Sequence, residues 1–256
     1  MFSLAGKNAF VTGGTSGIGK AVAEALIAHG ANVIVADITD GSDVAAEFGA
    51  GFVHVDVSSE DSIASALQQA VDQLKSKLDI IVLNAGVGDV GPTFEETDQA
   101  LIDKVTKINH WGVLYGLKHA PQNMNDHGSI ISSSSMAAFI NLPGAGVYSA
   151  GKRAVVSMTE MAALELGSRG IRVNAVCPGY TATALGSGAE GQKLCEAFTA
   201  LGRVATVDDM AGVYVFLASD ASSYMTGQAL KVDGGWHCGP TSKLLEMVTG
   251  SSEAPG

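Results

Sequence analysis

Short apolar runs alternate with longer amphipathic segments along nearly the whole chain. Some runs, such as residues 80–83, are apolar at almost every position, which is typical of strands buried on both faces. Strand–helix alternation of this kind predicts a parallel, doubly wound sheet. We expect strands at residues 8–12, 32–37, 51–56, 80–84, 128–133, 172–177 and 229–232, and helices at 18–29, 60–75, 98–124, 147–168 and 207–219.

The length and composition predict one domain. The chain has 256 residues, of which 46% are hydrophobic, and this is enough for one large core. No Pro-rich linker, repeat or break in composition divides it. We predict a single-domain, Rossmann-like α/β fold over residues 1–242, with helices flanking the parallel sheet. Residues 243–256 are expected to form a C-terminal extension whose Gly/Ser/Pro-rich end is mobile.

The charge and the absence of targeting patterns restrict the partners. The formal net charge is −11, which disfavours nucleic acid and anionic membranes because both attract basic patches. No apolar run reaches the ~20 residues of a membrane span, and the first residues lack a signal-peptide pattern. The three cysteines and six histidines show no metal-ligand spacing. We therefore expect a cytoplasmic protein without a metal, and a small molecule as its partner.

A glycine-rich turn lies between the first expected strand and the first expected helix. Its spacing is Gly-x-x-x-Gly-x-Gly. Glycines allow a tight turn and a close approach of the backbone to a pyrophosphate, and the helix N-terminus offers free N–H groups to the phosphates. A glycine-rich turn alone is often only a turn, but this position favours a dinucleotide site. The candidate cofactor-binding residues here are Gly13, Thr15, Ser16, Gly17, Ile18 and Gly19.

A carboxylate at the end of the second expected strand indicates which dinucleotide binds. Asp37 stands where it can accept hydrogen bonds from both hydroxyls of the adenosine ribose, and it would repel a 2′-phosphate. NADP would favour a cation nearby, but Ile38 and Thr39 follow Asp37 and supply none. The sequence therefore predicts NAD as the cofactor.

Polar and small residues follow the next two expected strands. The carboxyl ends of parallel strands meet at the ligand-binding edge of an open sheet. Asp56, with Val57 after it, can bond the adenine amino group, and the small Asn84-Ala85-Gly86 turn lets the backbone lie beside the ribose. These residues extend the predicted adenosine site.

Tyr148 and Lys152 are the strongest candidates for chemistry. Their spacing of four places them on one face of a helix, one turn apart. A free tyrosine titrates near pH ~10, and a nearby lysine cation favours the phenolate and lowers that pKa. Such a pair can move a proton on or off an alcohol oxygen, although taken alone it is more often a surface pair.

These motifs together resemble the short-chain dehydrogenase/reductase family. The resemblance covers residues 4–236, and it implies an NAD-dependent alcohol dehydrogenase that forms a homotetramer (or dimer) through the helices at 98–124 and 147–168. Leu83 and Ser132 depart from the family pattern, which often has asparagine at both positions, but neither departure removes a catalytic group. The resemblance rests on an ordered set of motifs: Thr12 to Gly19, Asp37, Asp56, Asn84 to Gly86, Asn109, Ser135, Tyr148 with Lys152, Pro178-Gly179, and Asp233-Gly234-Gly235.

The resemblance assigns four catalytic roles. Tyr148 matches the general acid/base, and Lys152 matches the residue that lowers the pKa of the tyrosine and bonds the nicotinamide ribose. Ser135 matches the serine that steadies the substrate oxygen. Ser134 is the alternative, but strand alternation lets only one of the two reach the site, and we select Ser135. Asn109 matches the asparagine that holds a water between Lys152 and solvent.

The loop after the sixth expected strand resembles the family segment that holds the nicotinamide amide. Its candidate cofactor-binding residues are Pro178, Gly179, Thr181 and Thr183. Thr183 fits the position whose hydroxyl meets the carboxamide or a phosphate, and Thr181 is the alternative.

The expected substrate pocket is mostly apolar. It comprises Tyr148, Tyr180 and residues 87–93, 136–142 and 184–198, and Lys193 is the only cation in these stretches. We therefore expect interconversion of a neutral, fairly apolar secondary alcohol and its ketone: a cyclic alcohol, hydroxysteroid, dihydrodiol or aryl alcohol. Residues 184–200 form either a mobile lid or a fixed helix, and Trp236 either reaches this pocket or belongs to a surface or intersubunit arm.

Three other functions compete with this interpretation. A non-catalytic NAD-binding regulator can share the fold, but such proteins often lose the catalytic residues that this chain keeps. A 3-oxoacyl reductase-like ketoreductase would use the same residues. A dehydratase or epimerase usually needs a larger C-terminal domain than the residues after Gly179 can form.

Overall fold

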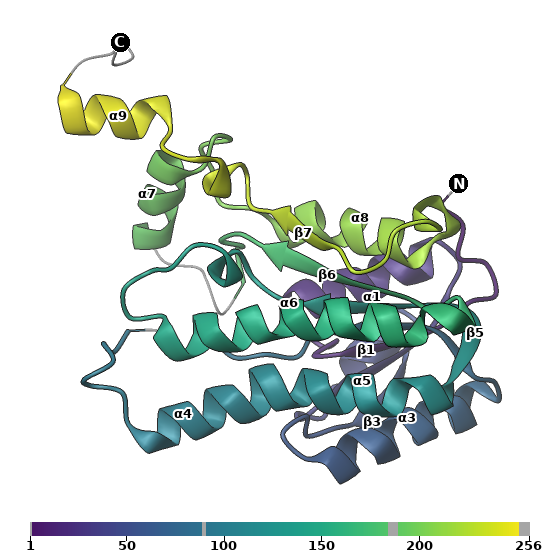
Figure 1. Ribbon diagram of the computed structural model, residues 1–256. Coiled ribbons are helices and arrows are strands. Elements are labelled where there is room, and N and C mark those ends of the chain that lie inside the picture. Colours follow the sequence, from purple (N-terminus) through teal and green to yellow (C-terminus); the bar gives the residue numbers. More distant parts are fainter. Residues whose placement is uncertain (1, 89–90, 184–188, 251–256) are drawn as a thin grey trace.

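Seven strands form one parallel sheet in a computed structural model of the protein, which describes residues 2–88, 91–183 and 189–250 (Figure 1). The strand order is β3-β2-β1-β4-β5-β6-β7, and each neighbouring pair is parallel. The predicted doubly wound α/β fold is therefore confirmed. The strands are β1 (Asn8–Thr12), β2 (Asn32–Asp37), β3 (Gly51–His54), β4 (Leu78–Leu83), β5 (Met124–Ser133), β6 (Arg172–Pro178) and β7 (Ala229–Val232).

Helices cover both faces of this sheet. A single turn of 3-10 helix, residues 136–138, follows β5. A π-helix, Thr106–Trp111, joins two of the α-helices. The α-helices are α1 (Gly17–Ala28), α2 (Ser42–Glu47), α3 (Glu60–Leu74), α4 (Gln99–Val105), α5 (Gly112–Asn123), α6 (Gly146–Leu166), α7 (Ala189–Phe198), α8 (Val207–Ala218) and α9 (Ser242–Thr249).

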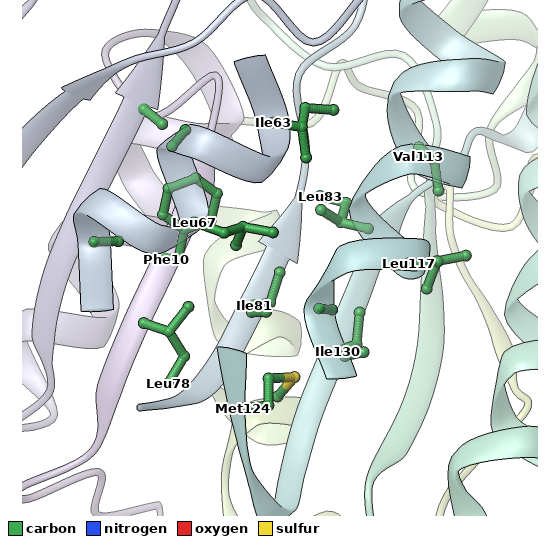
Figure 2. Close-up of a cluster of buried hydrophobic side chains, with 14 of the residues drawn as sticks. Phe10, Ile63, Leu67, Leu78, Ile81, Leu83, Val113, Leu117, Met124 and Ile130 are labelled. Atoms are coloured by element: carbon green, nitrogen blue, oxygen red, sulfur yellow. The ribbon is translucent and has the colours of Figure 1, made fainter. Parts of the chain in front are cut away.

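The continuous apolar runs arise because successive strand residues enter different cores. Phe10 and Ile81 pack with α3, α5 and α6 on one face (Figure 2). Their strand neighbours Val11 and Val82 pack with α1 and α8 on the other face. Since both faces are covered, apolar side chains are buried at successive positions of the central strands β1 and β4, and the period-two pattern of a half-exposed strand is lost.

Some boundaries differ from the sequence expectation. The helix expected at 98–124 is α4, the π-helix and α5 in succession, and α2 was not predicted, because only Ala45 of its six residues is buried. β3 ends at His54 and β4 at Leu83, so Asp56 and Asn84 stand just beyond the strands. These shifts leave the carboxyl ends of the strands at one edge of the sheet.

The C-terminal segment packs on the helix that precedes α8. Thr241 Oγ1 donates to Ala197 O, and Lys243 Nζ lies 3.4 Å from a carboxylate oxygen of Glu196. Figure 1 shows α7 and α9 together at one end of the molecule. Residues 251–256 of the predicted mobile end, which was expected at 250–256, lie outside the described residues, and so do residues 184–188 of the expected lid. The expected domain division at residue 242 stays a prediction.

Candidate active site

A cleft of about 480 Å³ opens at the carboxyl edge of the sheet. Nearly all residues predicted to bind the cofactor or the substrate oxygen line it. The exceptions are Thr15, Gly19 and Asn109, which lie behind the lining. The predicted residues that line the cleft are Gly13, Ser16, Gly17, Ile18, Asp37, Asp56, Val57, Asn84, Ala85, Gly86, Ser135, Tyr148, Lys152, Pro178, Gly179, Thr181 and Thr183.

The glycine-rich turn has the shape of a phosphate cradle. Gly13 adopts φ +64°, and a Cβ there would lie 2.9 Å from Ala85 Cα, so a side chain would close the turn. Ser16 precedes α1 in an extended conformation and its side chain makes no capping hydrogen bond. Thr183 lies against Gly17, with its methyl carbon 3.4 Å from where a Cβ would stand. The free N–H groups of α1 and the Thr183 side chain fit a dinucleotide pyrophosphate.

Two predicted residues of this turn act indirectly. Thr15 Oγ1 donates to Asp37 Oδ2 over 2.6 Å, so Thr15 orients the carboxylate instead of lining the cleft. Gly19 lets α1 dock on the turn, because a Cβ at this position would lie only 2.0 Å from Gly13 O.

We expect Gly19→Ala to be destabilised by at least about 3 kcal/mol and to lose NADH binding, because the added methyl group would push α1 away from the turn. Thermal unfolding and NADH fluorescence titration measure both effects. Gly212→Ala is the matched control: Gly212 is an exposed position of α8 with nothing within 4 Å of its Cβ site, and its replacement should be neutral or stabilising by up to about 1 kcal/mol. Equal behaviour of the two variants would contradict the docking role of Gly19.

The adenosine end of the cleft is acidic. Asp37 Oδ1 accepts from Ile38 N over 2.9 Å, which orients the carboxylate at the end of β2. Asp56 Oδ1 accepts from both Ser58 N and Ser58 Oγ. Lys152 is the one basic side chain among the described lining residues, and it belongs to the opposite, catalytic end.

The side chain of Lys152, a residue of α6, is buried against the end of β5. Its Nζ donates to Ser133 O over 2.9 Å and lies 5.7 Å from the centre of the Tyr148 ring. Burial lowers the pKa of Lys152 from 10.5 to about 8, and the nearby Cys177 opposes this change. Most Lys152 side chains are therefore charged at neutral pH, at a cost in stability.

Ser135 and Tyr148 lie together in the cleft. Burial raises the pKa of Tyr148, and a hydrogen bond with Ser135 partly offsets this effect. Ser134 points elsewhere, since its Oγ donates to Lys152 O over 2.7 Å. The serine at the tyrosine is thus Ser135. Without a bound cofactor, the phenol keeps its proton at neutral pH.

Asn109 lies beneath the catalytic end, in the π-helix. Its Oδ1 accepts from Val87 N and its Nδ2 donates to Val87 O, both over 2.8 Å. A Cβ on Gly86 would lie 3.0 Å from Asn109 Oδ1 and 3.4 Å from Lys152 Nζ, so a glycine is needed between them. The side chain of Asn109 positions the loop after β4, and its predicted role in holding a water stays a prediction.

We expect Lys152→Met to be more stable than the wild type at pH 7 although inactive. A pKa lowered from 10.5 to about 8 corresponds to a cost on the order of 3 kcal/mol for keeping the ammonium buried and charged. Between these two pH values the unfolded chain binds more protons than the folded one, so wild-type stability rises with pH across that window.

Urea unfolding at pH 7 and pH 10.5 tests this prediction. The advantage of Lys152→Met should be about 1–3 kcal/mol at pH 7, after the loss of the hydrogen bond to Ser133 O, and should shrink at pH 10.5. A variant less stable than the wild type at pH 7 would contradict it.

The remaining part of the cleft is apolar. Val87, Met136, Leu142 and Tyr180 line it, as expected for the substrate pocket. Trp236 also lines it and is stacked on Phe198, with ring centres 5.3 Å apart. Of the two expectations for Trp236, the pocket is the one that the structure supports.

Ser133 was not among the predicted site residues, although it lines the cleft and holds Lys152. The available signal was the run of four serines at the end of β5, which places hydroxyls where a buried strand is normally apolar. Within the described residues, no group of three or more His, Cys, Asp or Glu could hold a metal ion. No described helix is long and apolar enough to cross a membrane.

Comparison with known proteins places this site in a family. A sequence model of the family described as Enoyl-(Acyl carrier protein) reductase matches residues 13–237. The mitochondrial borneol dehydrogenase of Lavandula x intermedia is 40% identical over 239 residues, which is 91% of each chain. A short-chain type dehydrogenase/reductase from Mycobacterium marinum has a TM-score of 0.86 and 37% identity, covering 93% of this chain and 98% of its own.

A further solved structure of a similar protein contains a nicotinamide cofactor. A blue fluorescent protein from a metagenomic library, in complex with NADPH, has a TM-score of 0.86 and 32% identity, covering 91% of this chain and 99% of its own. Together with the fold and the cleft, these matches define the class: the chain belongs to the short-chain dehydrogenase/reductase family. It is an oxidoreductase that acts on alcohols and uses a nicotinamide cofactor.

Proposed function

We propose that this protein is an NAD-dependent dehydrogenase that interconverts a neutral, fairly apolar secondary alcohol and its ketone. The observation that carries the proposal is the meeting of Ser135, Tyr148 and Lys152 in the same cleft that Asp37 lines at its other end. A non-catalytic regulator would have no use for this group of three side chains.

The cofactor and the residues of the cleft each have a separate role in the reaction. The nicotinamide, when bound, supplies hydride acceptance and donation. Ser135 donates a hydrogen bond to the substrate oxygen, and Tyr148 Oη takes the hydroxyl proton during oxidation or returns it during reduction. A positive charge on Lys152 favours the phenolate, whereas burial raises the pKa of Tyr148. Gly86 leaves room beside Lys152 for the cofactor ribose.

Asp37 supports NAD over NADP. Its carboxylate is already oriented by Thr15 Oγ1 and Ile38 N, and none of the described residues that line this end of the cleft is basic. A 2′-phosphate would therefore meet a negative charge without a counter-ion. The NADPH-bound relative shows that this fold also holds the phosphorylated cofactor, so the choice depends on the residues at this one end.

The apolar lining supports a neutral substrate. Met136, Leu142 and Trp236 offer no charge to a carboxylate or a phosphate. The relative from Lavandula x intermedia is a borneol dehydrogenase, and borneol is a secondary alcohol without charge. Oxidation is the direction that we favour, since NAD dependence usually accompanies it.

Initial rates at 340 nm test the substrate class. The panel contains cyclohexanol, a hydroxysteroid, a 1-arylethanol and a dihydrodiol, with NAD+ and NADP+ in parallel. 4-Hydroxycyclohexanecarboxylate is the charged partner of cyclohexanol, and a 3-oxoacyl thioester with NADH tests the ketoreductase alternative. The proposal predicts that kcat/KM for cyclohexanol exceeds that for its carboxylate at least tenfold. The reverse order would exclude a neutral substrate, and a preferred thioester would establish the alternative.

We also propose a homotetramer, or a dimer, that assembles through α5 and α6. Leu114 on α5 and Met161 and Leu164 on α6 are 43%, 56% and 79% exposed, which is unusual for large apolar side chains on a monomer surface. A reducing cytoplasm remains our proposal for the location, because Cys177, Cys195 and Cys238 are all free thiols.

A further inference from the structure

A chain of hydrogen bonds, buried at Tyr214 and half-buried at Asn84, runs from α8 through the sheet to the glycine-rich turn. Tyr214, on α8, is completely buried, and its Oη lies 2.7 Å from Ser133 Oγ. Ser133 Oγ donates to Asn84 Oδ1 over 3.0 Å, and Asn84 Nδ2 donates to Gly13 O over 3.3 Å. The chain connects a helix on the far face of the sheet with the first glycine of the turn.

Only one arrangement of the protons satisfies this chain. Asn84 Nδ2 faces two carbonyl oxygens, of Thr12 and Gly13, which orients the amide and leaves Oδ1 as the acceptor for Ser133. A hydroxyl has one proton to donate. Since Ser133 donates to Asn84, its Oγ accepts the proton of Tyr214. Burial raises the pKa of Tyr214, so the phenol keeps its proton and remains a donor at neutral pH.

Ser133 joins this chain to the catalytic lysine. Its side chain faces Tyr214, whereas its main-chain oxygen accepts the hydrogen bond of Lys152 Nζ over 2.9 Å. Tyr214 packs in the core beside α1, and Lys152 comes from α6 on the opposite face of the sheet. Tyr214 is not among the residues that line the cleft, so its hydroxyl can affect catalysis only indirectly, and the hydrogen bond of that hydroxyl is to Ser133.

α8 is held in a way that suits a positioning role. A capping box between Thr206 and Asp209 fixes its first turn. Arg203 makes two contacts with the Asp209 carboxylate, at 2.6 and 2.8 Å. The helix that carries Tyr214 therefore begins at a defined residue and presents the phenol to Ser133 in one register.

We propose that Tyr214 is a positioning residue for Lys152. Through Ser133 it fixes the carbonyl oxygen that holds the Lys152 ammonium, and through Asn84 it holds the first glycine of the cofactor turn. The effect of Tyr214 on catalysis rests on the proposed dehydrogenase function. Its effect on the position of Lys152 is measurable without substrate or cofactor.

Tyr214→Phe tests the proposal, because it removes one hydroxyl and keeps the ring. In the cofactor-free protein labelled with 13Cε-lysine, NMR titration should give a wild-type pKa for Lys152 near 8 and a lower pKa in the variant, by roughly half a unit or more, because a looser hydrogen bond to Ser133 O favours the ammonium less. In steady-state assays with saturating NAD+, kcat should fall about fivefold, and the acidic limb of its pH profile should move to higher pH.

Two further variants separate positioning from stability. Thr159→Val removes another buried hydroxyl, whose hydrogen bond among the described residues is to Val155 O within α6. It should lower the melting temperature without moving the Lys152 pKa or the pH profile. Ser133→Ala breaks the same chain, so its effect and that of Tyr214→Phe should not add in the double variant. If Tyr214→Phe does not fold, Ser133→Ala carries the test.

The outcomes are distinct. An unchanged Lys152 pKa and an unchanged pH profile in both Tyr214→Phe and Ser133→Ala would overturn the proposal, whatever happens to the melting temperature. Fully additive effects of the two changes would also overturn it. A shifted Lys152 pKa in a protein that oxidises no alcohol would sustain the link to Tyr214 and refute the proposed function instead.

Discussion

Replacing Tyr148 with phenylalanine should lower kcat for alcohol oxidation by about 10²- to 10⁴-fold and leave NADH binding unchanged. The substitution removes the hydroxyl that contacts Ser135 in the cleft, and general acid–base catalysis typically contributes a factor of this size. The ring is retained, so the packing of α6 and the shape of the cofactor site should persist. The KM for the alcohol should change little, because the lost interaction acts mainly on the proton in the transition state.

Steady-state kinetics and NADH fluorescence titration measure the two quantities separately. Tyr224→Phe is the control, because Tyr224 is fully exposed and lies outside the cleft, and both its kcat and its NADH affinity should equal those of the wild type. If Tyr148→Phe kept more than about a tenth of the wild-type kcat, Tyr148 would not be the general acid/base. If NADH affinity fell in parallel with kcat, its role would be to shape the cofactor site.

The wild type should bind NADH at least about 100-fold more tightly than NADPH, and Asp37→Ser should remove most of this preference. A hydrogen bond to a charged group contributes about 1.5–3 kcal/mol. NADPH loses the two contacts between the adenosine ribose and Asp37, and its 2′-phosphate is repelled by the carboxylate. These two effects together account for the 100-fold preference for NADH. The double change Asp37→Ser with Ile38→Arg should invert the preference, because a guanidinium next to this position can bind the phosphate.

Titrations of intrinsic fluorescence with NADH and with NADPH give both dissociation constants. Asp40→Asn is the control, because it removes one negative charge from an exposed position three residues after Asp37. It should leave the ratio of the two dissociation constants unchanged. This result would separate the contact made by Asp37 from the effect of net charge. Equal affinities in the wild type, or a ratio unaltered by Asp37→Ser, would refute the interpretation of Asp37.

The parts of the site that were predictable from the sequence are those set by position along the chain. Asp37, Asn84 and Gly86 stand at or just beyond the carboxyl ends of strands, and parallel strands bring such ends to one edge whatever the details of packing. Tyr148 and Lys152 are one turn apart on one helix. Local periodicity therefore suffices to bring these side chains together.

The remaining features depend on contacts across the sheet. Ser133 and Tyr214 are 81 residues apart, and their hydrogen bond requires both the register of β5 and the docking of α8. Asn109 reaches Val87 from within a π-helix, whose hydrogen bonds span one residue more than those of an α-helix. Hydrophobic periodicity does not resolve so small a difference, so the sequence indicated one long helix there.

The most direct test of the account is to measure ketone and NADH in one reaction containing the wild type, NAD+ and a neutral secondary alcohol. We expect equal molar amounts of ketone, by gas chromatography, and of NADH, at 340 nm, with both formed at least about 100-fold more slowly by Tyr148→Phe. Tight NADH binding with no ketone from any alcohol of the panel would contradict it, and would identify the cleft as a dinucleotide-binding site without dehydrogenase chemistry.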